Sequence, residues 1–136
     1  PMDFRTEKQI GQDIRADFEQ LHFTGGYDHN YVLGRPGEKK IMANAYCRES
    51  GISLEAETDC CGVQFYAGNF IGEQTGKGGA SYHDRSAFCL ESQFYPNAVN
   101  EPDFPSPGIL SKRRPAPPGS RSTMPTATPG AALRSR

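Results

Sequence analysis

Short segments in which apolar and polar residues alternate, separated by turn residues, constrain the fold of this chain most. Residues 41–47 and 52–58 alternate with a period of two, and residues 49–51 (Glu-Ser-Gly) are typical of a hairpin turn between them. The faces expected to be buried carry Ile41, Ala43, Ala45 and Cys47 in the first segment and Ile52, Leu54 and Ala56 in the second. Further strands are expected within residues 63–70 and 86–97. Because helix signals are few, the pattern predicts an all-β, antiparallel fold.

The segment 86–97 is predicted to be a strand with an acid in the middle of one face. Phe88, Leu90, Ser92 and Phe94 point to one side of the pleat, and Ala87, Cys89, Glu91 and Gln93 point to the other. Two interpretations of the second face are open. Glu91 and Gln93 can form the floor of a polar cleft, or Glu91 can lie on a solvated face and pair with a nearby arginine.

A polar cluster, Asp28-His29-Asn30, follows two glycines that indicate a tight passage of the backbone. It is interpreted either as an Asx-type turn leading into a strand or as side chains that face a ligand. A zinc site or a catalytic triad is not favoured, because one His and one Asp are too few ligands and no Ser lies in a glycine-flanked elbow. Gln64 lies beside large aromatic residues in the strand predicted over residues 63–70.

The remaining segments carry weaker signals. Residues 2–5 are interpreted as the end of a strand, and residues 10–21 as a short helix or a turn-rich excursion. Residues 72–79 are similar to a phosphate-binding loop but lack its Ser/Thr and a following helix, so a long, mobile β-hairpin loop is expected. Residues 97–110 are expected to be extended, since their prolines exclude a central strand.

Charge is distributed unevenly along the 136 residues. Residues 1–110 hold nine basic and sixteen acidic residues, a net charge of −7, whereas residues 111–136 hold six basic residues and no acid. This tail has no aromatic residue and is rich in Pro, Ala, Ser and Arg, so disorder is expected there. Six cations could contact phosphates without specificity, but the acidic body argues against a nucleic-acid-binding protein.

Targeting and redox signals favour a reducing compartment. The sequence has no run of about 18 apolar residues and opens with no charged and apolar leader, so neither a membrane span nor a signal peptide is expected. It begins at Pro1 without an initiator Met, which suggests a fragment or a processed product. The cysteines form no C-x-x-C pair, so free thiols and a cytoplasmic location are expected, with no metal site: Cys47, Cys60, Cys61 and Cys89.

Five blocks of the sequence resemble, in order and spacing, the C-terminal part of the aldose 1-epimerase (galactose mutarotase) family. They are Pro1-Met-Asp-Phe-Arg5, Gly25-Gly-Tyr-Asp-His-Asn30, Gly62-Val-Gln-Phe-Tyr-Ala-Gly-Asn-Phe70, Gly76-Lys-Gly-Gly79 and Phe88-Cys-Leu-Glu-Ser-Gln93. The resemblance covers residues 1–110. It implies that they form the C-terminal part of an antiparallel β-sandwich of the galactose mutarotase type, with a sugar cleft on its concave side and residues 111–136 as a separate tail.

The resemblance also implies an activity, the interconversion of α and β anomers of aldohexoses such as galactose and glucose. Glu91 is then the general base that takes the proton from the anomeric hydroxyl. Asp28 matches an aspartate that accepts hydrogen bonds from sugar hydroxyls, and Gln64 matches a glutamine that contacts the substrate near the base. The family uses no metal and no organic cofactor. The expected partner is therefore a small aldose, not a nucleic acid or a membrane.

The sequence departs from the family pattern in three places. The family's catalytic acid is a histidine of the N-terminal part, and none of His22, His29 and His83 matches it; His29 is expected to pack or cap. Residues 59–62 (Asp-Cys-Cys-Gly) replace a Thr- and Pro-containing turn, which leaves the rigidity of that turn open. Residues 111–136 replace a final strand, which suggests an out-of-frame reading or an unrelated extension.

Two functions from different classes follow from this comparison. In the first, the chain is part of an isomerase and shows little or no epimerase activity alone, because the proton donor to the ring oxygen is missing. In the second, it is a non-catalytic sugar-binding module that keeps Asp28 and Gln64. The intact Glu91 favours the first function, since a binding module needs no base there.

Overall fold

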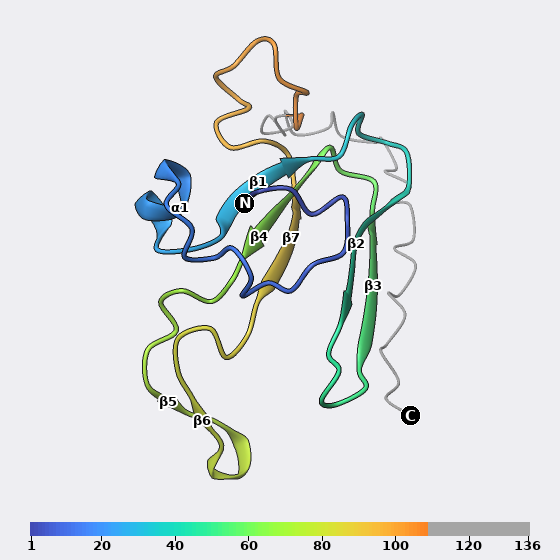
Figure 1. Ribbon diagram of the computed structural model, residues 1–136. Coiled ribbons are helices and arrows are strands. Elements are labelled where there is room, and N and C mark those ends of the chain that lie inside the picture. Colours follow the sequence, from blue (N-terminus) through green and yellow to red (C-terminus); the bar gives the residue numbers. More distant parts are fainter. Residues whose placement is uncertain (109–136) are drawn as a thin grey trace, which may run out of the picture.

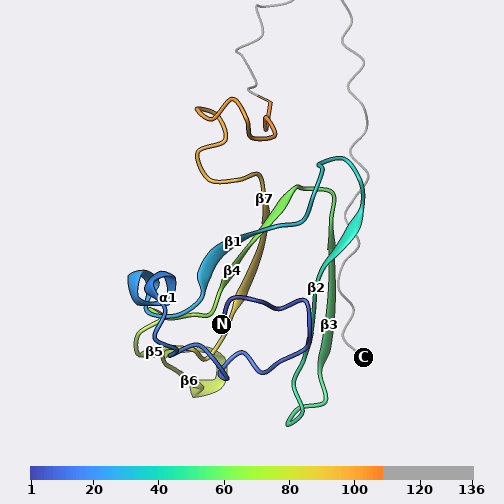
Figure 2. The ribbon, with the colours of Figure 1, turned by 45° about the horizontal axis from the view of Figure 1, so that its top comes forward.

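The computed structural model describes residues 1–108, and antiparallel β-strands dominate within them (Figure 1). β1 (Asp28–Val32), β4 (Gly62–Tyr66) and β7 (Cys89–Gln93) form a three-stranded sheet in the order β1-β4-β7. β2 (Lys40–Tyr46) and β3 (Ser53–Thr58) form a separate hairpin that stands beside this sheet (Figure 1 and Figure 2). The predicted all-β, antiparallel fold is confirmed.

β4 is the central strand, and its register with both neighbours decides which side chains share a face. Directly opposed residues of antiparallel strands point to the same side of a sheet. One face, here called the polar face, carries Asp28, Asn30 and Val32 of β1, Gly62, Gln64 and Tyr66 of β4, and Cys89, Glu91 and Gln93 of β7. The opposite face, here called the core face, carries His29, Tyr31, Val63, Phe65, Leu90 and Ser92. The two faces predicted for the strand around Glu91 are therefore confirmed within β7.

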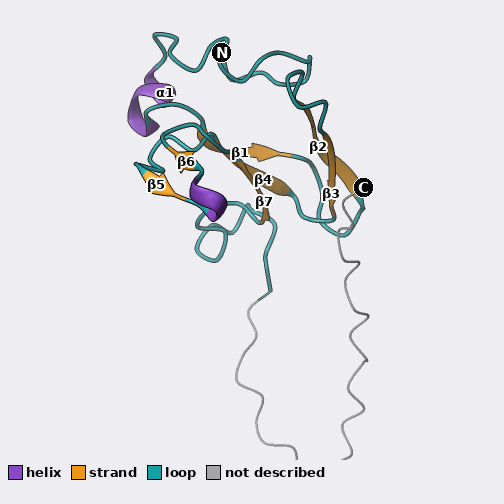
Figure 3. Ribbon diagram, turned by 90° about the horizontal axis from the view of Figure 1, so that it is seen from below, coloured by secondary structure: helices purple, strands orange, loops and turns teal. Residues whose placement is uncertain are grey.

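Aromatic side chains form the hydrophobic core on the core face. The buried rings of Phe65 and Tyr27 stack with centroids 5.6 Å apart, and Phe4 packs edge-on against them at 5.4 Å and 4.9 Å. Tyr31 borders this core, and burial raises the pKa of its hydroxyl to about 12. Figure 3 shows the N-terminal segment as a layer of loop on one side of the sheet.

Residues 2–5 form no strand, so that prediction is wrong. The side chains of Met2 and Phe4 pack against the core instead. The backbone N–H of Arg5 donates to Asp3 Oδ1 at 2.9 Å, and its guanidinium donates to Asp3 Oδ2 at 2.6 Å. Local bonds of this kind offer the backbone an alternative to a strand ladder.

Residues 10–21 are turn-rich at first and helical only at the end. Hydrogen bonds from the Gln12 N–H to Gln9 O and from the Ala16 N–H to Asp13 O close the turns, and α1 (Glu19–Thr24) follows. Gly25 ends the helix in the left-handed region, with φ 64°, where glycine is favoured. The turn-rich interpretation is therefore confirmed for residues 10–17, and the helix lies further along the chain than expected.

The β2–β3 hairpin is confirmed, but the burial predicted for its apolar residues is wrong. Ile41, Ile52 and Leu54 are 51%, 68% and 42% exposed. A bulge between Ile41 and Ala43 breaks the alternation of β2, so Ile41 does not continue the face of Ala43. Within residues 1–108 no other strand packs extensively against this hairpin.

Residues 72–79 contribute to a second hairpin, which confirms the β-hairpin predicted there. It consists of β5 (Gln74–Thr75) and β6 (Ser81–Tyr82), joined through a short 3-10 turn, η1 (Lys77–Gly79). Residues 97–108 contain no strand, as their prolines predict, but the extended conformation expected there is wrong in part, because turns form at residues 97–100 and 101–104. All four cysteines are free thiols. The predicted disordered tail, residues 111–136, lies outside the described residues. No helix in the described part is both long enough and apolar enough to cross a bilayer.

Candidate active site

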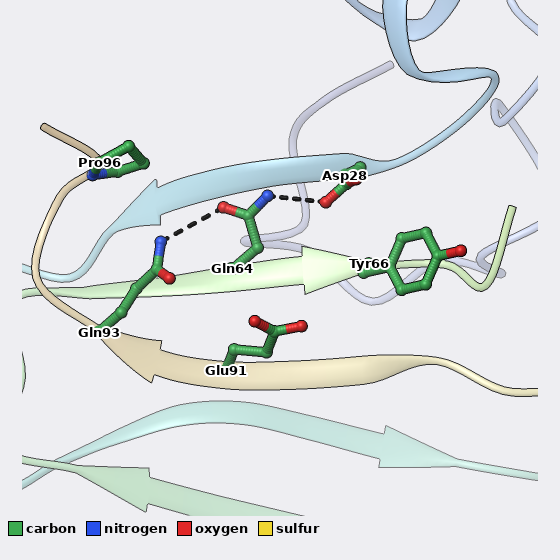
Figure 4. Close-up of a pocket in the computed structure, with 6 residues that line it drawn as sticks. All are labelled: Asp28, Gln64, Tyr66, Glu91, Gln93 and Pro96. Carbon is green, nitrogen blue, oxygen red and sulfur yellow. Dashed lines mark hydrogen bonds between the residues drawn. The ribbon is translucent and has the colours of Figure 1, made fainter. Parts of the chain in front are cut away.

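An open pocket of about 390 Å³ lies on the polar face of the three-stranded sheet (Figure 4). Its lining comes from all three strands and the segment after β7: Asp28, Gln64, Tyr66, Glu91, Gln93 and Pro96. The structure therefore brings the three predicted site residues, Asp28, Gln64 and Glu91, into one pocket. Its volume lies within the range of roughly 300–1,000 Å³ that is typical of small-molecule sites.

The polar residues face the pocket because the residues between them are held in the core. Phe65, which separates Gln64 from Tyr66, is 8% exposed, and Leu90, which precedes Glu91, packs against the same core. Turning either strand over would expose these apolar side chains and bury the polar ones. Packing on the core face thus directs Gln64 and Glu91 into the pocket.

A hydrogen bond joins two of the predicted residues. Gln64 Nε2 donates to Asp28 Oδ1 at 2.7 Å, and both residues are half-buried. Asp28 Oδ2 remains as an acceptor and the second Nε2 hydrogen as a donor, neither with a partner among residues 1–108. An acceptor beside a donor suits a hydroxyl group, which both donates and accepts hydrogen bonds.

Glu91 lies directly opposite Gln64 on the neighbouring strand, and its carboxylate points into the pocket (Figure 4). The residue is exposed, and no lysine or arginine of the described part forms an ion pair with it. The pairing with an arginine that was the alternative interpretation is thus not formed within residues 1–108. A carboxylate that faces a pocket without an ion-pair partner can accept a proton from a bound hydroxyl group.

Sequence reasoning missed two pocket residues, Tyr66 and Pro96, and it predicted Gln93 in the floor of a polar cleft without its hydrogen-bond partners. Gln93 Nε2 donates to Gln64 Oε1 at 3.3 Å and to Asn30 Oδ1 at 3.1 Å. The Tyr66 ring forms one end of the pocket, and its hydroxyl accepts a hydrogen bond from the Phe70 N–H at 2.9 Å. Tyr66 lies two residues after Gln64, so the strand period that placed Gln93 beside Glu91 was also the signal that could have found Tyr66. Pro96 lies beyond β7 and gave no such signal.

No histidine is among the residues that line this pocket. His29 belongs to the core face, and its Nδ1 accepts a hydrogen bond from the Asp28 N–H at 3.0 Å, which agrees with a packing or capping role. Residues 1–108 also contain no group of three His, Cys, Asp or Glu side chains placed to hold a metal ion. The carboxylates and amides that do line the pocket can bind hydroxyl groups, and a carboxylate can accept a proton from one.

Comparison with known proteins places these residues in a family context. A sequence model of the family described as Aldose 1-epimerase matches residues 1–113. The chain is 48% identical over 109 residues to galactose mutarotase of Mus musculus, an alignment that covers 79% of this chain and 30% of that protein. It is 43% identical over 104 residues to galactose mutarotase of Sus scrofa, with coverages of 76% and 29%.

A bacterial relative aligns with a similar share of the chain. The chain is 36% identical over 106 residues to aldose 1-epimerase of Escherichia coli (strain K12), with coverages of 77% of this chain and 30% of that protein. The chain thus spans about three-tenths of the length of the curated relatives that it matches.

Proposed function

The chain belongs to the aldose 1-epimerase family, and on that basis we propose that it supplies the general base and part of the sugar site of an aldose 1-epimerase. The proposed reaction interconverts the α and β anomers of aldohexoses such as galactose and glucose, which makes the whole protein an isomerase. The pocket is the observation that supports this most. Glu91 and Gln64 are opposed in register, and Gln64 is hydrogen-bonded to Asp28.

In the proposed mechanism, Glu91 accepts the proton of the anomeric hydroxyl. The bond between C1 and the ring oxygen breaks, C1 becomes an aldehyde carbon, and the ring oxygen takes a proton from an acid. Rotation about the C1–C2 bond and reversal of the proton transfers close the ring with the other configuration. Only protons move and nothing is oxidised, so side-chain acids and bases suffice for the chemistry.

The acid that protonates the ring oxygen is proposed to come from outside residues 1–108. The pocket is lined by carboxylates, amides, a phenol and a proline, with no histidine. The resemblance implies a histidine of the family's N-terminal part for this step. The chain is accordingly proposed to lack epimerase activity on its own.

A sugar-binding module without catalysis is the second candidate. It is favoured by the same absence of a histidine from the pocket lining, because the amide and carboxylate of Gln64 and Asp28 can bind a hydroxyl without any acid. The two candidates differ in the role of Glu91. A binding module needs Glu91 at most as an acceptor, whereas the isomerase needs it as a base.

Polarimetry of freshly dissolved α-D-galactose tests the proposal. The chain alone is compared with a fusion in which the N-terminal part of a galactose mutarotase precedes it, and with that N-terminal part alone. We expect only the fusion to speed the drift of optical rotation. A fusion that binds galactose without speeding the drift would favour the binding module, and a fast drift with the chain alone would show that the acid lies within it.

We further propose a boundary and a location. Residues 1–110 are proposed to form the part of the family domain that this chain carries, and residues 111–136 a separate basic tail; the end of the family match at residue 113 supports this division. Four free cysteines are typical of proteins from a reducing compartment, which supports a cytoplasmic location.

A further inference from the structure

A series of side-chain hydrogen bonds crosses the polar face from β7 to β1. Gln93 Nε2 donates to Asn30 Oδ1 at 3.1 Å and to Gln64 Oε1 at 3.3 Å, and Gln64 Nε2 donates to Asp28 Oδ1 at 2.7 Å. These four residues are called the amide chain below. Gln93 uses both hydrogens of its amide in these bonds. The amide chain therefore links the two predicted sugar ligands to residues that the proposed mechanism does not use.

The carboxylate of Asp28 sets the direction of every bond in the amide chain. A carboxylate only accepts, so Gln64 must turn its NH₂ group toward Asp28 and its carbonyl toward Gln93. Gln93 must then present its own NH₂ group, and Asn30 must present its carbonyl. Reversing one amide would bring two acceptors or two donors together. The four side chains thus have one consistent arrangement, which leaves the second Nε2 hydrogen of Gln64 for a ligand.

Gly62 makes room for the amide chain in the central strand. It lies directly opposite Gln93 of β7, and Asn30 lies diagonally across on β1. A Cβ atom at Gly62 would lie only 2.6 Å from Asn30 Oδ1 and 3.2 Å from Asn30 Nδ2. A side chain here would displace the Asn30 amide from its place. The missing side chain is therefore what lets Gln93 reach Asn30 across β4.

We propose that Gln93 is a positioning residue: with Asn30, across Gly62, it locks the Gln64 amide with its NH₂ group toward Asp28 and the pocket. A locked amide offers a fixed donor beside the Asp28 acceptor and cannot turn to offer its carbonyl. The Gln64 donor and the Asp28 acceptor together then select a sugar hydroxyl that donates to Asp28 and accepts from Gln64. This selection rests on the proposed function, whereas the locking needs no bound sugar.

Solvent exchange of the side-chain amide protons, followed by NMR on the full chain without sugar, tests the locking. Gln93→Met keeps the length of the side chain and removes its amide. We expect the Gln64 amide protons to exchange about three- to tenfold faster in this variant, the effect of losing one hydrogen bond. The matched control is Gln20→Met, which removes an exposed amide on α1 and is expected to leave Gln64 unchanged.

Two more variants separate positioning from space filling. Gln93→Glu keeps the shape of the side chain, but its carboxylate only accepts hydrogen bonds. Its oxygens would then face the carbonyl oxygens of Gln64 and Asn30, so we expect it to disturb Gln64 at least as much as Gln93→Met does. Gly62→Ala displaces Asn30 and is expected to reproduce the effect. In the unmodified chain, the Gln93 amide protons should exchange more slowly than those of Gln20, a comparison that needs no variant to fold. Unchanged Gln64 exchange in both Gln93 variants, or equally fast exchange of Gln93 and Gln20, would overturn the proposal.

A titration of the same samples with D-galactose keeps this proposal apart from the proposed function. We expect galactose to shift the Gln64 amide signals and to bind about three- to tenfold more weakly to Gln93→Met. Slow exchange at Gln64 and Gln93 without any galactose-induced shift would support the locking and count against the sugar site. Galactose-induced shifts together with unchanged Gln64 exchange in the variants would overturn the locking and leave the sugar site in place.

Discussion

Gly26 adopts a conformation that other residues rarely adopt, just before β1 begins. Its φ is 144°, and a Cβ atom there would collide with Asn69 Oδ1. Asn69 is buried, and its Nδ2 donates to the carbonyls of Thr24 and Tyr27, at 3.0 Å and 3.1 Å. These bonds hold the turn two residues before Asp28. A single glycine therefore helps to fix where the first acceptor of the pocket lies.

Gly26→Ala is expected to lower the free energy of unfolding by about 2–4 kcal/mol, since it combines backbone strain with a clash against a buried amide. Urea unfolding measures the change. Gly11→Ala is the matched control, because a Cβ at Gly11 would meet nothing within 4 Å. Equal stability of the two variants would contradict the role given to the Gly26 turn.

At the scale of the elements, Thr58 holds the turn whose rigidity the sequence left open. Its hydroxyl oxygen accepts a hydrogen bond from the Cys60 N–H at 2.9 Å, and it also bonds the hydroxyl of Ser92 on β7. Thr58 is 6% exposed. The end of β3 is thus joined to the core face of β7, without the proline that the family pattern has in this turn.

The strand period allowed the faces of the sheet to be predicted, but not the register between its strands. Alternation alone placed Glu91 and Gln93 on one face of β7. The bonds from Gln93 to Asn30 and Gln64 join residues that are 63 and 29 positions apart, and no local pattern specifies which residues of separate strands face each other. The bulge in β2 was also not predictable, because one extra residue changes the alternation without a distinctive composition.

The exposed apolar face of the β2–β3 hairpin predicts self-association of the chain. Leu54 is 42% exposed, and contiguous apolar surface and free strand edges favour association. Leu54→Lys should therefore shift sedimentation toward the monomer. Ser53→Lys adds the same charge on the opposite side of β3 and serves as the control. The same degree of association in the Leu54 variant and the unmodified chain would contradict this prediction.

At the scale of the whole molecule, the three-stranded sheet at the centre of residues 1–108 has a covered core face and an open polar face. The N-terminal segment covers the core face with Phe4, Ile10 and Ile14, so the other face stays free for the pocket. The family resemblance predicted this pocket's three principal residues because its blocks fall on β1, β4 and β7. The proton donor could not be predicted, since no block of this sequence matches it.

The optical rotation of α-D-galactose in the presence of the fusion protein tests the role of Glu91 most directly. Glu91→Gln keeps the shape of the side chain but removes the base, so we expect the rate of anomerisation to fall at least about a hundredfold. Glu55→Gln makes the same change at an exposed residue of β3 and is expected to leave the rate unaltered. A Glu91→Gln fusion whose rate stays within about twofold of the unmodified fusion would contradict the assignment of Glu91 as the general base.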